Sequence, residues 1–312
     1  MTRTSLLAYA LRRVLWALPL LLFVMLLTFA LMRGAGGSPF RLESGGLPLS
    51  LQIQFTNFYG LDQPWFVQFG HYVQNVFTLH FGPSLTNRWV TVDDVIRQGL
   101  PVTGKLALLA SMWAIGLGVP LGVLAGTRRS TVLDYLASGL ATTMLALPIF
   151  LVVQASTQYL AGDWGLVPLG WQSWRTRIVA SFVLGLAPAG YVARLIRAAV
   201  VETLQQDYVR TAHAKGLRRQ RIVGVHVLRN SLAPALGAVP PTLALLVTGT
   251  FFVETKFRIP GAGVFFVQAA KNRDYPMVMG LTVALAAIVI AANLLADVTA
   301  AALDPRIREK RA

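Results

Sequence analysis

The chain has 312 residues, of which 55% are hydrophobic and 13% charged, with a formal net charge of +15 and no cysteine. One water-facing core of this length cannot bury so much apolar surface, so the composition excludes an ordinary soluble domain and predicts a lipid-embedded protein whose excess Lys and Arg faces anionic headgroups rather than nucleic acid. The absence of cysteine excludes disulfides, thiolate metal sites and a cysteine nucleophile.

Six charge-poor segments follow one another along the chain. They are Val14–Met32, Leu106–Ala125, Tyr135–Ala161, Ile178–Ala193, Ser231–Val253 and Met277–Ala296. A helix needs about 20 residues to cross about 30 Å of hydrocarbon, and the fourth segment reaches that length only if Arg194 and Arg197 extend into the headgroups. The basic residues before the first segment resemble the start of a secretory signal, but its length favours an uncleaved anchor. We therefore predict an all-α fold, a polytopic membrane protein with six transmembrane helices.

Basic residues set the predicted orientation. If the six helices alternate in direction, seventeen of the 28 Lys and Arg residues fall on one side. The positive-inside rule places that side in the cytoplasm. Because the number of helices is even, both termini are predicted to be cytoplasmic, in a multi-pass protein of the cell inner (plasma) membrane.

Two long connections divide the chain. Residues 1–32 hold a cytoplasmic tip and the first helix, and residues 33–105 predict an extracytoplasmic cap segment of short aromatic helices. Residues 106–300 form a core domain with five transmembrane helices, and residues 301–312 form a basic cytoplasmic tail. Within the core domain, the cytoplasmic loop 201–230 carries many of the basic residues, so we expect partners to dock there.

Some intramembrane residues indicate packing. Gly118, Gly122 and Gly126 recur at every fourth residue, and such a stripe lets a neighbouring helix approach closely, so it predicts a packing seam. Near the inner end of the last helix, Asp297 needs water or a partner, and we expect a structural contact there. Prolines predict bends, either static or used to open a path, at Pro148, Pro188, Pro234, Pro240 and Pro241.

Patterns for enzyme chemistry are weak. The segment Gly99–Leu106 has the glycine and lysine spacing of a phosphate-binding loop, but Leu106 stands where Ser or Thr should bind Mg²⁺, Pro101 stiffens the loop and no strand precedes it. The histidines lack metal-ligand spacing, and spacing singles out no catalytic set. We predict no catalytic, cofactor-binding or metal-binding residue, and no enzyme activity of this chain's own.

The cytoplasmic loop predicts two helices. The first is expected to run from Val201 to about Lys215, with Gly216 as its stop, because glycine adopts the left-handed conformation without a steric penalty. Leu217 would then fold back against it.

One face of this first helix is predicted to be apolar. Tyr208, Val209 and Ala212 are expected to share it, while Arg210 and Lys215 point elsewhere. Such a face suits a groove on a soluble partner or, equally, the headgroup surface of the membrane.

The sequence of the same loop is similar to that of a known protein family. Residues 208–217, YVRTAHAKGL, closely resemble the cytoplasmic loop of permeases in the dipeptide and oligopeptide class of ABC importers. The class is also matched, in order, by LRR at 11–13, GLDQP at 60–64, HVLRN at 226–230, FRIPGAG at 257–263, RDYP at 273–276 and DPRIR at 304–308. The loop has Arg210-Thr211-Ala212 where the broader importer signature has Glu-Ala-Ala, as the peptide class commonly does.

The resemblance implies roles for particular residues. In the family, this loop holds a coupling helix that fits a groove on the ATPase subunit. ATPase coupling is thereby implied for Asp207, Tyr208, Arg210, Thr211, Ala212, Lys215, Gly216 and Leu217. A gating or outer-face contact is implied for Pro260, Gly261, Gly263, Asp274 and Tyr275.

The resemblance also implies an assembly with the fold of an ABC type I importer permease. The expected partners are a homologous second permease, two ATP-binding subunits and an extracytoplasmic solute-binding protein, with ATP and Mg bound by the partner subunits and no cofactor bound by this chain. The expected function is import of dipeptides or oligopeptides. The same importer class for nickel, glutathione or other small solutes stays open, and a secondary transporter is disfavoured because five of the six segments have no ionisable residue at mid-membrane.

Overall fold

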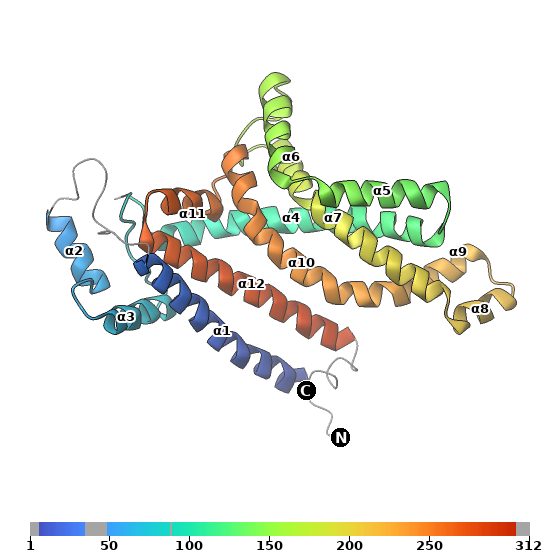
Figure 1. Ribbon diagram of the computed structural model, residues 1–312, viewed down its shortest axis with the longest axis horizontal. Helices are drawn as coiled ribbons and strands as arrows, with labels where there is room; N and C mark the ends of the chain where they lie inside the picture. Colours follow the sequence, from blue (N-terminus) through green and yellow to red (C-terminus); the bar gives the residue numbers. More distant parts are fainter. Residues whose placement is uncertain (1–5, 35–48, 88, 304–312) are drawn as a thin grey trace.

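The computed structural model describes the backbone of residues 6–34, 49–87 and 89–303, and this part of the chain is built of helices (Figure 1). The α-helices are α1 (Leu6–Gly34), α2 (Leu49–Tyr59), α3 (Trp65–Phe77), α4 (Val92–Thr127), α5 (Val132–Ala146), α6 (Ile149–Ala155), α7 (Trp174–Leu204), α8 (Asp207–Ala214), α9 (Arg219–Arg221), α10 (Leu228–Phe257), α11 (Ala262–Lys271) and α12 (Tyr275–Leu303). Two π-helices, η1 (Ser156–Asp163) and η2 (Ile222–Val227), complete the set. Within the described residues, β-type pairing is limited to one isolated bridge, between Pro83 and Thr91. The all-α prediction is confirmed.

Several helices are long and apolar enough to cross a membrane. In the searched part of the chain these are Ala10–Gly34 in α1, Val92–Thr127 in α4, Trp174–Leu204 in α7 and Tyr275–Leu295 in α12. The pair Val132–Ala146 and Ile149–Asp163 gives one more if it counts as a single bent span. α10 occupies the predicted segment Ser231–Val253, but the side chains of residues 233–245 lie outside the described part. The number of six spans therefore stays a prediction.

The predicted span Tyr135–Ala161 is not one straight helix. α5 ends at Ala146, Pro148 precedes α6, and the axes of the two halves differ by 90°. Proline disfavours the helical conformation in the residue before it, and Leu147 accordingly has an extended backbone with ψ 120°. Pro148 thus divides a continuous apolar segment into two helices joined by a sharp bend.

The segment with the weakest sequence signal is part of a long central helix. α7 extends over 31 residues, and half of its most apolar stretch is buried. Gly185 lies against the Ala110 carbonyl of α4, and Gly190 lies against α5. Arg197 does not extend into the headgroups as expected, because its Nε and Nη2 atoms donate to the Asp134 carboxylate at 2.7 and 2.9 Å. Small residues lower the hydropathy of α7, but they fit it to neighbouring helices rather than to lipid.

α4 begins well before the predicted start of its apolar segment. Thr91 caps the helix, accepting the Asp94 N–H at 3.1 Å, while the Asp94 carboxylate accepts the Thr91 N–H at 3.3 Å. The 36 residues of α4 span about 54 Å at about 1.5 Å per residue, so the helix is longer than the hydrocarbon layer. The boundary predicted at residue 105 falls inside this helix, and Gly99–Leu106 is helical rather than a phosphate-binding loop.

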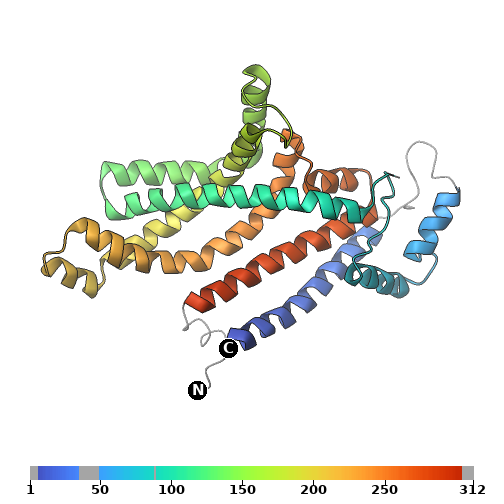
Figure 2. The ribbon, with the colours of Figure 1, turned by 180° about the vertical axis from the view of Figure 1, so that it is seen from behind.

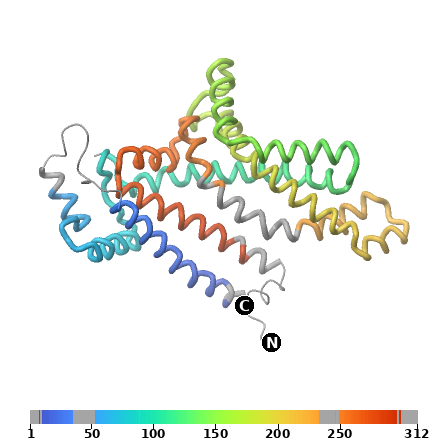
Figure 3. Tube along the Cα trace, in the orientation of Figure 1, coloured from blue at the N-terminus to red at the C-terminus, as the bar shows by residue number. Residues whose placement is uncertain are grey.

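The molecule has two distinct ends. α2, α3 and α11 gather at one end of the long axis and α8 and α9 at the other, as Figures 1 and 2 show from opposite sides. The path of the chain between the ends can be followed in Figure 3. α1 runs beside α12, where Arg13 pairs with Asp297 at 3.0 Å, which is the structural contact expected of that carboxylate. Residues 304–312 of the predicted basic tail lie outside the described residues.

Candidate functional site

The glycine stripe of α4 lies against α7. A Cβ atom added to Gly118, Gly122 or Gly126 would come within 2.5–2.7 Å of atoms of α7. At Gly122 the nearest of these atoms is the Ala193 carbonyl oxygen, at 2.5 Å. The two backbones are therefore closer than any residue with a side chain would allow, and α4 and α7 are in close contact along the length of the stripe.

The predicted stop of the cytoplasmic helix is present, but the helix before it is shorter than expected. Gly216 has φ +75°, and the Leu217 N–H returns to the Ala212 oxygen at 3.3 Å, as in a glycine-terminated helix. The single helix predicted from Val201 is instead two, because α7 ends at Leu204 and Gln206 has an extended backbone with ψ 146°. This break turns α8 away from the axis of α7.

The break gives α8 a buried face and an exposed one. Val209 and Ala212 are buried in an apolar cluster with residues of α7 and η2, and Leu217 packs against the same cluster. Tyr208 does not share this face as predicted, since it is 42% exposed and its hydroxyl accepts a hydrogen bond from Asn230 at 2.9 Å. The apolar face therefore fixes α8 to its own chain. Of the residues with an implied coupling role, those left exposed are Asp207, Tyr208, Arg210 and Thr211 of α8, with Lys215 and Gly216 directly after it.

α8 and the segment after it pack on the ends of the long helices. Arg219, just after α8, donates from Nη2 to the Thr127 carbonyl in the last turn of α4 at 2.5 Å, where a cation also complements the helix dipole. Beside it, the Asp134–Arg197 pair joins the start of α5 to α7, and the Asp134 carboxylate also accepts the Ser130 N–H at 3.0 Å. These contacts link the segment that follows α8 to the end of α4, and the start of α5 to α7. Sequence reasoning missed the roles of Asp134 and Arg219, since no local pattern joins residues so far apart.

At the opposite end, a buried carboxylate joins three helices. Glu254 of α10 is fully buried; its Oε1 accepts the Thr103 hydroxyl of α4 at 2.7 Å, and its Oε2 accepts the Gly263 N–H of α11 at 2.8 Å. Thr250 and Val264 also donate to this carboxylate. Gly261 lies directly against the carboxylate, with no room for a side chain. Gly261 and Gly263 therefore enclose Glu254, and both are buried, so neither offers a direct contact to a partner. Pro260, which lies between the end of α10 and Gly261, is exposed.

Asp274 is also buried rather than available to a partner. It is 1% exposed, and its carboxylate accepts the Ser84 hydroxyl, the Thr86 hydroxyl at 2.9 Å and the Leu85 N–H at 3.2 Å. A hollow of about 260 Å³ lies beside these groups, between residues 84–90 and α11. The outer-face contact expected of Asp274 stays a prediction, and the buried carboxylate itself offers no exposed surface for it.

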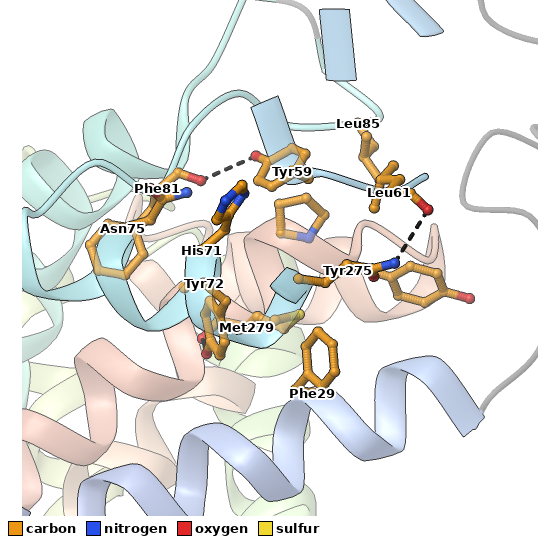
Figure 4. Close-up of a pocket in the computed structure, with 13 residues that line it drawn as sticks. Phe29, Tyr59, Leu61, His71, Tyr72, Asn75, Phe81, Leu85, Tyr275 and Met279 are labelled. Carbon is orange, nitrogen blue, oxygen red and sulfur yellow. Dashed lines mark hydrogen bonds between the residues drawn. The ribbon is translucent and has the colours of Figure 1, made fainter. Parts of the chain in front are cut away.

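Tyr275 lies in the wall of a small apolar cavity. This cavity, of about 100 Å³, lies between the cap helices, α1 and the start of α12, as the side chains in Figure 4 show. The Tyr72 hydroxyl donates to the Met279 carbonyl at 3.2 Å, and the Tyr59 hydroxyl lies 2.9 Å from the Pro83 carbonyl. Burial raises the pKa of both hydroxyls far above the usual value, with the nearby carboxylates of Asp274 and Asp93 adding to the effect at Tyr59. Both therefore stay protonated donors at physiological pH.

Metal-ligating residues do not gather in the described part of the chain. No group of three or more His, Cys, Asp or Glu side chains there is arranged to hold a metal ion. The structure instead shows an exposed helix face on α8, the close contact of α4 with α7, and at the other end two buried carboxylates, Glu254 and Asp274.

Comparison with known sequences covers almost the whole chain. Residues 118–309 match the family described as binding-protein-dependent transport system inner membrane component. The dipeptide transport system permease protein DppB of Bacillus subtilis is 37% identical over 295 residues, covering 94% of this chain and 96% of that protein. The oligopeptide transport system permease protein OppB of Salmonella typhimurium is 35% identical over 305 residues, covering 97% and 99%.

Solved structures share the fold of the core. An inward-facing structure of the MetNI methionine ABC transporter aligns with a TM-score of 0.55 at 18% identity, covering 67% of this chain and 96% of that chain. A crystal structure of an amino acid ABC transporter aligns with a TM-score of 0.51 at 15% identity, covering 68% and 94%.

Proposed function

Because this chain belongs to the family of binding-protein-dependent transport system inner membrane components, we propose that it forms one half of the membrane path of a dipeptide or oligopeptide importer. The chain is a permease of an ABC importer, and it resembles permeases named for dipeptide and oligopeptide transport. The observation that carries the peptide assignment is 34–37% identity to such permeases over at least 94% of this chain.

The path is formed with a second, homologous permease. The two hollows described above, in the part of the chain that the structure describes, measure about 100 and 260 Å³, and both are smaller than the roughly 300–1,000 Å³ of a typical ligand pocket. A peptide path therefore fits better between two subunits than inside one. An extracytoplasmic solute-binding protein delivers the peptide to the outer end of this path.

Energy enters from two separate ATP-binding subunits, which bind ATP and Mg, whereas this chain binds no cofactor. The exposed residues of α8, among them Tyr208, Arg210 and Lys215, meet the ATPase surface. Two contacts support this proposal. The buried face of α8 packs against α7, and Arg219 is hydrogen-bonded to α4, so a partner docked on α8 would be connected to both long helices. When the ATPases close, α8 moves with them and carries α4 and α7 as one body.

Orientation follows from this arrangement. α8 lies on the cytoplasmic side of the inner membrane, both termini are cytoplasmic, and α2, α3 and α11 lie outside. The excess of basic residues assigned to the α8 side supports this orientation.

The proposed substrate class is tested by uptake in a strain that lacks the chain. Labelled dipeptides and pentapeptides are supplied in turn, with and without the chain restored, and nickel and glutathione are supplied in parallel. We expect the chain to restore peptide uptake alone. Restored uptake of nickel or glutathione without peptide uptake would contradict the peptide assignment while leaving the importer class in place.

A further inference from the structure

One side of α7 stays exposed along the half of the helix that packs on the glycine stripe of α4. Between residues 181 and 203, the exposed residues of α7 are Tyr191, Arg194, Ala198 and Glu202. They recur at every third or fourth position and therefore share one side of the helix. None of them is an aliphatic residue larger than alanine, so this side lacks the groups that pack well against acyl chains.

The exposed side of α7 lies at the depth of the membrane. Cβ atoms on Gly118 and Gly122 of α4 would lie 2.7 and 2.5 Å from the carbonyl oxygens of Ala189 and Ala193. This contact puts Arg194 level with the apolar segment of α4. Arg194 forms no ion pair with the residues that the structure describes. A charge at this depth is costly unless it faces water or a partner.

The neighbouring helix α5 has an apolar side and a polar one. Its apolar side carries the exposed leucines Leu133, Leu136 and Leu140. Another side, with the same spacing along the helix, carries the hydroxyl groups of Tyr135, Ser138 and Thr142. Two sides of such different chemistry face two different surroundings, and only the leucine side suits lipid.

The hydroxyl side of α5 is the one next to α7. The Ser138 hydroxyl donates to Asp134 Oδ1 at 3.1 Å, and Arg197 of α7 donates to the same oxygen at 2.7 Å. Tyr135 lies within electrostatic range of Arg197, and Arg194 precedes Arg197 by one turn. The hydroxyl side of α5 and the exposed side of α7 therefore border each other. We call this surface the α5–α7 polar face; it consists of Tyr135, Ser138, Thr142, Tyr191, Arg194 and Ala198.

Neither lipid nor a tightly packed helix suits the α5–α7 polar face. Where this chain is open to lipid it carries leucines, on α5 as described and on α1, where Leu15, Leu18 and Leu22 are exposed. Hydroxyl groups and a guanidinium in hydrocarbon would lose their hydrogen bonds to water. A close helix seam uses small residues, as α4 does in its glycine stripe, and would bury the charge of Arg194.

A water-filled path satisfies every group on this surface. Water hydrates the guanidinium and the hydroxyls, and polar residues inside a membrane commonly mark the route of a substrate. A peptide brings amide groups, which exchange hydrogen bonds with hydroxyls, and at least one carboxylate, which a guanidinium attracts strongly where the dielectric constant is low. The exposed side of α7 continues to Glu202, close to α8, so the path opens at the α8 end of the molecule.

We propose that the α5–α7 polar face lines the peptide path and that Arg194 is a specificity-determining residue within it. This inference rests on the proposed function and adds one wall of the path and its selectivity. Arg194 contacts the carboxylates of the passing peptide and thereby favours acidic peptides over basic ones.

The native absence of cysteine makes a direct test of the wall possible. Thr142→Cys and Tyr191→Cys are each assembled with cysteine-free partner subunits and treated with a positively charged methanethiosulfonate reagent. Leu136→Cys and Leu140→Cys, on the leucine side of α5, are the matched controls. Reaction needs an ionised thiol in contact with water. We expect positions 142 and 191 to react at least tenfold faster than 136 and 140, and only their modification to block peptide uptake.

The outcomes separate this inference from the proposed function. Equally slow reaction at all four positions would show that lipid or the second permease covers the α5–α7 polar face, and would overturn the inference while peptide uptake stands. Fast reaction at 142 and 191 without loss of uptake would overturn it as well. If the unaltered importer takes up no peptide, the proposed function fails, and the role of Arg194 fails with it.

The selectivity is tested with two tripeptides that differ in one charge, Ala-Glu-Ala and Ala-Lys-Ala, at saturating concentrations. Arg194→Gln is expected to lower the maximal rate for the acidic peptide about fivefold relative to the basic one, and Arg194→Lys to retain most of the preference. Arg129→Gln, at an exposed arginine before α5, is the control and should leave the ratio unchanged. An unchanged ratio in Arg194→Gln, in an importer that still hydrolyses ATP, would contradict the role of Arg194.

Discussion

Single atoms decide the packing of α4 on α7. A Cβ atom on Gly122 would lie 2.5 Å from the Ala193 carbonyl oxygen, whereas a Cβ atom on Gly116, on the same helix, would meet nothing within 4 Å. The same substitution at the two positions therefore has opposite consequences.

Gly122→Ala is expected to lower the free energy of unfolding by about 1–3 kcal/mol, because α7 would have to move away. Gly116→Ala, the matched control, is expected to be neutral or to stabilise by up to about 1 kcal/mol through helix propensity. Thermal melting of the purified chain, followed by tryptophan fluorescence, measures both. Equal melting temperatures for the two variants would contradict the seam.

The Thr103 hydroxyl makes two buried hydrogen bonds at the end of the molecule opposite α8. Thr103 donates to Glu254 at 2.7 Å and accepts the Ala262 N–H at 3.0 Å, so it joins α4 to both α10 and α11. Thr103→Val keeps the shape but leaves both partners unsatisfied, and we expect a loss of about 1–3 kcal/mol. Thr143→Val removes only an exposed bond to the Gly139 carbonyl within α5, and should change the melting temperature little. A Thr103→Val protein as stable as Thr143→Val would show that the junction does not depend on this hydroxyl.

Among the helices, α8 is predicted to couple ATP hydrolysis by the partner subunits to uptake, rather than to stabilise the chain. Lys215 is exposed, and Gly216 has a positive φ that a branched residue adopts only with strain. Lys215→Glu and Gly216→Val are expected to reduce uptake at least tenfold while the assembled importer still hydrolyses ATP. The measurement is uptake and phosphate release from the same proteoliposomes.

The control for these variants is Lys256→Glu, which makes the same charge change at an exposed residue of α10 near the other end of the molecule. It should leave the ratio of uptake to hydrolysis unchanged. Normal uptake by both α8 variants would remove α8 from the coupling role.

Local patterns predicted the elements better than their junctions. The stop at Gly216 and the long apolar helices α1, α4 and α12 follow from chemistry within a few residues, which a sequence displays directly. The break before α8 and the exposed position of Tyr208 depend instead on which cluster Val209 and Ala212 join. That cluster includes residues of η2, which no periodicity within α8 could indicate.

Pairs of distant residues explain the remaining misses. Arg197 meets Asp134 across 63 positions, and Thr103 meets Glu254 across 151. From the sequence, Arg197 is expected to extend into the headgroups, and Asp134, Thr103 and Glu254 have no predicted role, because the sequence does not show which helix becomes the neighbour of each residue. The apolar segment Ile178–Ala193 is shorter than the helix α7 that contains it for a related reason. A helix surrounded by protein uses small residues such as Gly185 and Gly190 to contact its neighbours, and these residues lower its hydropathy.

For the whole molecule, the cysteine-free sequence allows its orientation to be measured with single cysteines. Trp89→Cys in intact cells is expected to react with a membrane-impermeant maleimide, and Lys215→Cys only after the membrane is made permeable. Both positions are exposed, so the difference reports the side of the membrane and not burial. Labelling of position 215 in intact cells would contradict a cytoplasmic α8.

The central claim is that this chain provides a path and receives its energy from other subunits through α8. The most direct measurement is uptake of a labelled peptide into proteoliposomes that contain the chain with the second permease, the ATP-binding subunits and the binding protein, compared with proteoliposomes that lack the ATP-binding subunits. The account predicts ATP-dependent uptake in the first case and none in the second, whatever ion gradient is imposed. Uptake driven by an ion gradient without the ATP-binding subunits, or ATP hydrolysis by this chain alone, would contradict it.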